Sequence, residues 1–169
     1  MKKMMFIILS LLVTSTVQSQ TVVTGVVIDV LEGDIVKVLS QQGDTLSVKF
    51  NNIECPEIGQ SYAEEAKAYT KKLALKKTVS VTYTETDRDL HALGTVLLSN
   101  GKDVGAHLLA QGLAWHYVKG LNAEPNTQLY LDLEQKAREK KKGLWKDQNP
   151  MAPWTFRNHQ NKWEGKTSI

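Results

Sequence analysis

Hydrophobic and polar residues alternate along much of the first half of the chain, a pattern typical of β-strands. The stretch 24–40 is rich in β-branched residues and is broken by the motif Glu32-Gly33-Asp34. The stretch 45–54 follows a glycine-containing turn and alternates Leu46, Val48 and Phe50 with Ser47, Lys49 and Asn51. These two stretches predict three strands.

A helical period replaces the alternation at residues 62–77, where hydrophobic residues recur every three or four positions. Acidic residues come early and lysines come late in this stretch, as the helix dipole favours. Residues 78–85 and 93–102 return to alternation and predict two more strands. The pair Asn100-Gly101 in the second of them is typical of a tight turn.

Two more helices are expected in the second half of the chain. Asp103 can cap a helix that runs to Gly112, because a carboxylate oxygen accepts hydrogen bonds from the free N–H groups of a first helical turn. Leu129, Leu133 and Ala137 recur at helical spacing and predict the buried face of the next helix.

The order of the predicted elements is three strands, a helix, two strands and two helices. Strands and helices do not alternate regularly, so a doubly wound sheet is disfavoured, and five short strands suit a small, highly curved barrel. We therefore predict an α+β fold, mainly β, with a five-stranded barrel and three helices. The proline-containing segment after residue 147 also carries aromatic residues and is expected to be a tail that lies on this domain before it frays.

The N-terminal segment has the pattern of a signal peptide. Lys2 and Lys3 precede an apolar run, and small residues stand before a cleavage point after Ser19. The run is short for a membrane span, so we expect an exported protein, periplasmic or secreted, without stable membrane association. The mature chain would have 150 of the 169 residues, enough for one domain.

Net charge says little about the partner of this protein. The formal net charge is +3 for the whole chain and +1 without residues 1–19. Basic residues gather at 136–146, which holds six lysines and arginines against one acid. Cys55 is the only cysteine, so no disulfide can form within the chain.

Three carboxylates offer candidate chemistry. Asp34 follows Gly33 at a strand break, and Glu54 and Glu57 flank Cys55-Pro56. Oxygen ligands of this kind suit calcium or magnesium, and an acid beside the ion could act as a base toward water. On spacing alone, a polar turn and a loop with solvated acids explain the same residues more often.

The chain contains, in order, the blocks LEGDIVKV, VKFNNIECPEIGQSYAEEAKAYTKKL, DRDLHALGTVLLSNGKDV, LLAQGLAWHY and LEQKAREKKKGLWKDQNPMAPWTFR. Together they resemble the staphylococcal-nuclease-like (thermonuclease) family over residues 24–157. The resemblance implies a five-stranded OB-fold barrel with three helices. It also implies metal-dependent, usually calcium-dependent, cleavage of phosphodiester bonds in DNA and RNA. The expected organisation is a signal peptide at 1–19, a nuclease-like domain at 20–157 and a C-terminal tail at 158–169.

The same resemblance implies roles for individual residues. Asp34 and Glu54 would bind the metal through their side chains, and Cys55 through its backbone carbonyl. Glu57 would be the general base. Glu54 stands where the family has an aspartate and is one methylene longer, and Glu32 likewise replaces an aspartate.

Two cationic positions depart from the family pattern. Lys49 and His91 stand where arginines are expected. Lysine gives phosphate a point charge rather than a planar fork, and histidine is charged only below a pKa of about 6.5. Tyr117 lies in the block that flanks the nucleotide pocket of the family, where a ring can stack on a base.

The sequence therefore predicts an exported, metal-dependent nuclease, with Ca²⁺ as the expected cofactor and Mg²⁺ or Mn²⁺ as substitutes. Lys49, Glu57 and His91 would be catalytic, and Lys49 and Tyr117 would contact nucleic acid. We expect a monomer. We also expect reduced activity, because both arginines are replaced. The alternative is a catalytically impaired nucleic-acid-binding module or a partner-binding scaffold.

Overall fold

The computed structural model describes residues 20–117 and 126–164, with side chains up to residue 160. The predicted signal peptide at 1–19 and the end of the predicted tail at 165–169 lie outside these residues. No helix in the described ranges is long and apolar enough to cross a membrane.

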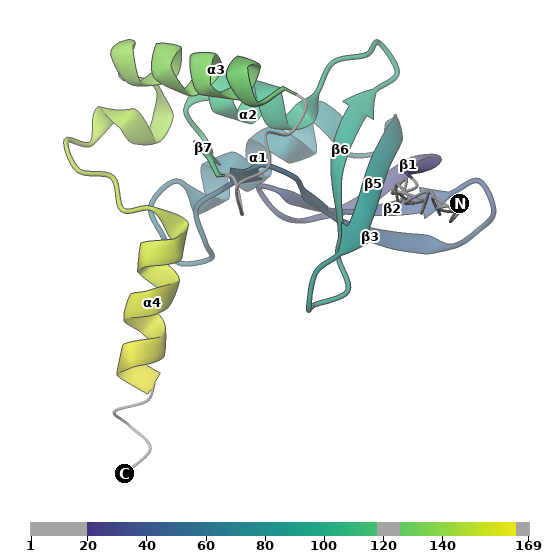
Figure 1. The fold of residues 1–169 in the computed structure, drawn as a ribbon, viewed down its shortest axis with the longest axis horizontal. Coiled ribbons are helices and arrows are strands. Elements are labelled where there is room, and N and C mark those ends of the chain that lie inside the picture. Colours follow the sequence, from purple (N-terminus) through teal and green to yellow (C-terminus); the bar gives the residue numbers. More distant parts are fainter. Residues whose placement is uncertain (1–19, 118–125, 165–169) are drawn as a thin grey trace, which may run out of the picture.

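A closed five-stranded barrel forms the centre of the molecule (Figure 1). Its order is β1-β2-β3-β6-β5, antiparallel except for the parallel pair β3–β6, and β1 also pairs with β5 to close it. The strands are β1 (Thr21–Glu32), β2 (Ile35–Ser40), β3 (Thr45–Phe50), β5 (Thr78–Thr86) and β6 (Ala92–Leu98). The predicted barrel and its five strands are confirmed.

The inward positions of the barrel are filled mainly by valine. Val36, Val48 and Val81 are fully buried and alternate with more exposed residues along their strands, as expected for a half-buried sheet. Register shifts in β1 and β5 add the local bend that closure of so few strands requires. Gly25 permits a close approach of β1 and β2, since a Cβ there would lie 2.3 Å from the Leu39 carbonyl oxygen.

The three predicted helices are present as α1 (Ala63–Ala74), α2 (Val104–Gln111) and α3 (Thr127–Glu139). Asp103 caps α2 as predicted, because its Oδ1 accepts hydrogen bonds from the N–H groups of Gly105 and Ala106 at 2.8 and 3.2 Å. Gly112 ends α2 in the left-handed conformation with φ 68°.

The buried face of α3 differs from the prediction. Leu129 is 48% exposed, whereas Tyr130 and Glu134 are buried together with Ala137. Tyr130 donates a hydrogen bond of 2.5 Å from its hydroxyl to Oδ2 of Asp103, the cap of α2. This polar contact between α2 and α3 fixes the rotation of α3, and a hydrophobic stripe alone does not reveal it.

The predicted third strand is divided in two. β3 ends at Phe50, and Asn52 turns the chain with a positive φ of 61°. Ile53 and Glu54 then form the short strand β4, which pairs with β7 (Trp115–His116) outside the barrel. Glu54 is thereby held against the GLAWHY segment rather than at the end of a barrel strand.

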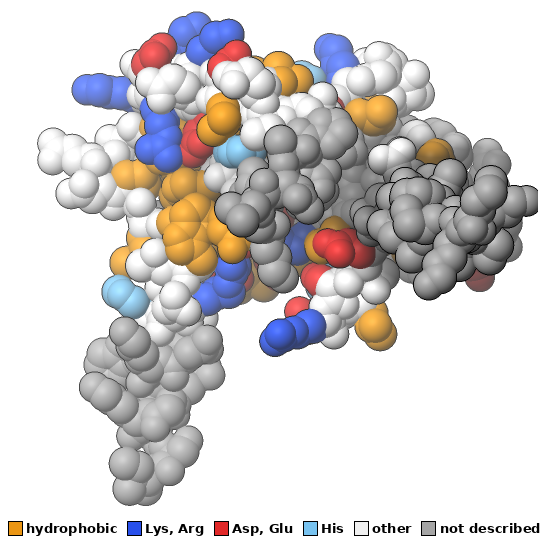
Figure 2. Space-filling view, in the orientation of Figure 1, with side chains coloured by type: hydrophobic (Ala, Val, Ile, Leu, Met, Phe, Trp, Pro, Cys, Tyr) orange, Lys and Arg blue, Asp and Glu red, His pale blue; other side chains and the backbone are white. Residues whose placement is uncertain are grey.

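After α3 the chain forms a short 3₁₀ helix, η1 (Gly143–Lys146), and the segment after residue 147 then contains a fourth helix, α4 (Pro153–Glu164), that the sequence pattern did not predict. Pro153 occupies the first position of α4, where its fixed φ favours helix and its missing N–H costs nothing. The rest of α4 leaves the body of the molecule (Figure 1). Figure 2 shows hydrophobic side chains gathered where α4 joins that body, with a basic side chain beside them.

Gly33 fixes the turn between β1 and β2 against the rest of the domain. A Cβ at this position would lie 2.7 Å from Sγ of Cys55 and 2.8 Å from Cβ of Ala66. The Thr70 hydroxyl of α1 donates a buried hydrogen bond of 2.5 Å to the Gly33 carbonyl. The buried Cys55 thiol therefore has a packing role, and burial raises its pKa far from that of a reactive thiol.

We expect Thr70→Val to lower the free energy of unfolding by about 1–3 kcal/mol, because the buried Gly33 carbonyl loses its donor while the side-chain volume is kept. Thr70→Ser keeps the hydroxyl and should cost about 1 kcal/mol or less. Urea unfolding followed by tryptophan fluorescence measures both values. A serine variant as unstable as the valine variant would show that the hydrogen bond is unimportant.

Candidate active site

A cleft of about 430 Å³ lies where β2, β3 and β6 meet the β5–β6 loop and the first turns of α4. Its walls combine acids, cations, amides and aromatic or aliphatic side chains. The lining residues are Glu32, Ile35, Lys49, Phe50, Asn51, Asn52, Ile53, Glu54, Glu57, Asp87, Asp89, His91, Leu93, Tyr117 and Arg157. Five of the predicted site residues therefore line one cleft: Lys49, Glu54, Glu57, His91 and Tyr117.

Asp34 and Cys55 lie beneath this cleft rather than on its wall. Asp34 is only 3% exposed, and its Oδ2 accepts a hydrogen bond of 3.2 Å from the Cys55 backbone N–H. The contact places the β1–β2 turn directly against the segment that follows Glu54. Glu32, on the other side of Gly33, lines the cleft instead.

Burial of these acids is electrostatically costly in the absence of a bound cation. Burial raises the pKa of Asp34 from 3.8 to about 7, against the opposing effects of the Lys49 charge and the Cys55 N–H. Burial and the nearby Glu57 charge raise the pKa of Glu32, and Lys49 and His91 oppose this shift. The site thus carries more negative charge than its cations balance.

Arg157 joins the two glutamates of the ECPE segment. Its Nη2 donates to Glu54 Oε2 at 2.8 Å, and its Nη1 donates to Glu57 Oε1. Burial would lower the pKa of the Arg157 guanidinium, but hydrogen bonds and charge from both glutamates hold it above its ordinary value. Arg157 is not among the site residues predicted from the sequence, although it ends the last block of the family resemblance.

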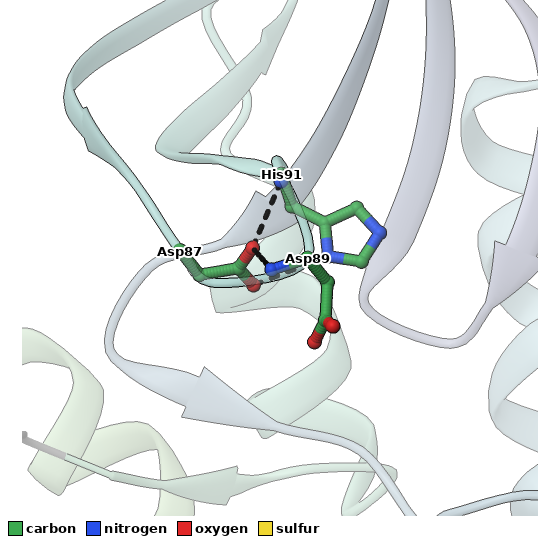
Figure 3. Close-up of side chains that lie close together, drawn as sticks. All are labelled: Asp87, Asp89 and His91. Atoms are coloured by element: carbon green, nitrogen blue, oxygen red, sulfur yellow. Dashed lines mark hydrogen bonds and ion pairs between the residues drawn. The ribbon is translucent and has the colours of Figure 1, made fainter.

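Lys49 and His91 lie on the same cleft but have different surroundings. Lys49 makes no ion pair within 4.0 Å to a residue in the described ranges, so its charge faces the cleft. The Nδ1 of His91 lies 3.1 Å from Oδ2 of Asp87 (Figure 3). Burial alone would raise the pKa of Asp87, but hydrogen bonds with His91 keep it below its ordinary value.

The β5–β6 loop brings Asp87, Asp89 and His91 together. They offer ligand atoms within 4.8 Å of one another and are the one such group of three in the part of the chain that the structure describes. Asp87 Oδ1 also accepts the backbone N–H groups of Asp89 and His91 at 2.9 and 2.8 Å. An acidic group that could bind a metal is thus present, while its hydrogen bonds also close the loop.

Tyr117 directly follows β7, the short strand that pairs with β4, and lines the cleft. Its N–H donates to the Asn52 carbonyl at 2.9 Å, and its ring packs on Trp154 of α4 with centroids 5.0 Å apart and planes at 30°. Tyr117 therefore lies between the cleft and α4, and part of its ring surface is already covered.

Comparison with known proteins matches residues 47–147 to the model of the family described as staphylococcal nuclease homologue. A protein of Escherichia coli O157:H7 named uncharacterized endonuclease is 34% identical over 136 residues, which cover 80% of this chain and 86% of that protein. Micrococcal nuclease of Shigella flexneri is 30% identical over 141 residues, 79% of each chain.

The staphylococcal-like nuclease CAN1 of Arabidopsis thaliana is 35% identical over 114 residues, 67% of this chain and 33% of that protein. The family match includes Lys49, Glu54, Glu57, His91 and Tyr117, and it ends before Arg157. With the barrel and the cleft described above, these similarities show that the chain belongs to the staphylococcal nuclease homologue family.

Proposed function

We propose that the protein is an exported, cation-dependent endonuclease that hydrolyses phosphodiester bonds of DNA or RNA as a monomer. Family membership and relatives named endonuclease and micrococcal nuclease support nuclease activity. The observation that carries the proposal is the cleft in which Glu54 and Glu57 face Lys49, His91 and Arg157. Acids able to hold a cation or activate water lie there beside cations able to bind phosphate.

The residues present fit a hard divalent cation. Asp34, Glu54 and the Cys55 carbonyl would hold it, since all three offer oxygen ligands on segments joined by the Asp34–Cys55 hydrogen bond. The buried Asp34 carboxylate has no ion-pair partner within 4.0 Å in the described ranges. A bound cation would supply charge neutralisation of the phosphate and a lower pKa of water.

Glu57 would orient and deprotonate the attacking water. It lies on the cleft wall, is partly exposed and follows the rigid Cys55-Pro56 pair. Lys49 would contact the phosphate, and His91 would add charge only when protonated. Because neither supplies a planar, permanent charge, we propose that activity is lower than an arginine at each position would give.

A second candidate is a nucleic-acid-binding module without cleavage. This function is favoured by the two hydrogen bonds that the Arg157 guanidinium donates to Glu54 and Glu57, the proposed metal ligand and base. The purified mature protein, incubated with plasmid DNA and with RNA, separates the two functions. Cleavage with Ca²⁺, Mg²⁺ or Mn²⁺ that a chelator abolishes supports the enzyme. Retention of nucleic acid without cleavage under every condition supports the module.

Export is tested separately from chemistry. Expression of the whole chain should place the protein outside the cytoplasm, with an N-terminus at Gln20 after cleavage. An uncleaved N-terminus, or retention in the cytoplasm, would contradict export and leave the nuclease proposal unaffected.

We expect Glu57→Gln to lower kcat by about 10²–10⁴-fold with little change in cation affinity, because it removes the proposed base and no proposed ligand. Calorimetric titration of the cation and initial rates on a labelled oligonucleotide measure the two effects. Glu64→Gln is the matched control, since Glu64 is an exposed acid in the first turn of α1. A large loss of cation affinity in Glu57→Gln would assign Glu57 to the metal instead.

Asp34→Asn should stabilise the cation-free protein at pH 8 by about 1–4 kcal/mol, because the folded state no longer buries an ionised carboxylate. The raised pKa of Asp34 in the folded state means that the wild type loses stability as pH rises from about 4 to 7. Denaturant unfolding in chelator at pH 5 and pH 8 measures this loss, which the variant should lack.

Addition of Ca²⁺ should then stabilise the wild type and not Asp34→Asn, because only a folded protein with the ligand binds the ion. An Asn variant that is less stable than the wild type at pH 8 in chelator would contradict this account of Asp34.

A further inference from the structure

We propose that Arg157 is a phosphate-binding residue of the active site, delivered by α4, which supplies the planar cation that Lys49 and His91 lack. The inference rests on the proposed nuclease function. Arg157 is the only arginine among the residues that line the cleft. It lies outside the span matched by the family model, so that match does not assign it a role.

The orientation of the Arg157 guanidinium supports a phosphate-binding role. Two of its nitrogens bind two different carboxylates, Glu54 and Glu57, which lie 103 and 100 residues away in the sequence. The fork therefore points between the proposed metal ligand and the proposed base, where the scissile phosphate must bind. Phosphate oxygens suit the same paired N–H geometry as carboxylate oxygens.

The guanidinium also has donors to spare. Arginine carries five N–H groups, and two hydrogen bonds to described residues account for only part of them. The Arg157 side chain is 38% exposed, compared with 8% for Glu54. Arg157 can thus contact a phosphate from solvent while it still holds the glutamates in place.

The start of α4 is built to hold this position. Trp154 packs on Tyr117, and Gln60 bridges the two segments. Gln60 Oε1 accepts the Glu57 N–H at 3.0 Å, and its Nε2 donates to the Met151 carbonyl just before α4. The base-carrying loop and the arginine-carrying helix are therefore coupled, although the rest of α4 leaves the domain (Figure 1).

The excess of acids in the cleft favours an additional permanent cation near a bound phosphate. Five acids line the cleft and would repel a polyanion: Glu32, Glu54, Glu57, Asp87 and Asp89. Opposite them, Lys49 carries one charge, and His91 carries one only when protonated. Arg157 adds a charge that persists at every physiological pH.

The opposite role is an inhibitory one, in which Arg157 blocks Glu54 and Glu57 and must leave before a cation binds. The two roles predict opposite effects of its removal. Phosphate binding predicts loss of activity on removal of the guanidinium, whereas blocking predicts equal or higher activity.

The test compares wild type, Arg157→Gln and Arg157→Lys, with Arg88→Gln as the matched control. Arg88 is an exposed arginine of the β5–β6 loop that does not line the cleft. We expect Arg157→Gln to lower kcat by about 10²–10³-fold, as loss of one transition-state donor does, and Arg157→Lys to recover only part. Arg88→Gln should stay close to wild type. Circular dichroism and melting curves establish that each variant is folded.

Chemical rescue isolates the guanidinium itself. Millimolar guanidinium should restore part of the activity of Arg157→Ala, and methylammonium at the same concentration should not. Wild-type activity in Arg157→Gln would overturn the proposal in favour of a structural role, and higher activity would overturn it in favour of an inhibitory role.

A binding measurement separates this inference from the proposed function. If the wild type cleaves nothing with any cation, the nuclease proposal fails, and affinity for a phosphorothioate oligonucleotide in chelator still tests Arg157. Loss of one phosphate contact should reduce the slope of log K against log salt by about 0.7 for a single strand. Identical slopes for wild type and Arg157→Gln would overturn phosphate binding by Arg157.

Discussion

The hydrogen bond from the Cys55 N–H to the buried Asp34 carboxylate joins the two segments on which the site depends. It forms only because Gly33 has no side chain, since a Cβ there would overlap Cys55 and Ala66. Thr70 of α1 then fixes the Gly33 carbonyl. The turn between β1 and β2 is thereby locked to the start of the ECPE segment, and the barrel core and the acidic site share one set of contacts.

The burial of acids beside the cleft determines the electrostatics of the candidate active site. A carboxylate as buried as Asp34 stays ionised at neutral pH only at a cost in stability, which a bound cation would offset. Negative charge around the cleft also requires cations near any bound phosphate. Lys49 faces the cleft without an ion pair in the described ranges, whereas His91 is paired with Asp87. The two positions at which the resemblance implies arginines thus hold groups with different electrostatic environments.

The C-terminal helix changes how the replacement of these arginines is interpreted. Arg157 lies on the first turns of α4 and reaches both glutamates of the ECPE segment. Tyr117 packs on Trp154, and Gln60 links the Glu57 loop to the segment before α4. When only the barrel is considered, the cleft lacks a planar, permanent cation, and α4, which lies outside the barrel, adds one. Truncation of the chain before α4 would remove part of the site and leave the barrel strands intact.

Local patterns in the sequence determined the five barrel strands, the first three helices and the Asp103 cap, because alternation, helical period and capping act between neighbours. Tertiary structure decided what depends on distant contacts. The Tyr130–Asp103 hydrogen bond set the rotation of α3, and β7 captured Glu54 on a separate strand. Packing around Gly33 buried Asp34, and α4 brought Arg157 across 100 residues to Glu57. No local period encodes such contacts, since they arise only when the barrel closes and its ends meet the helices.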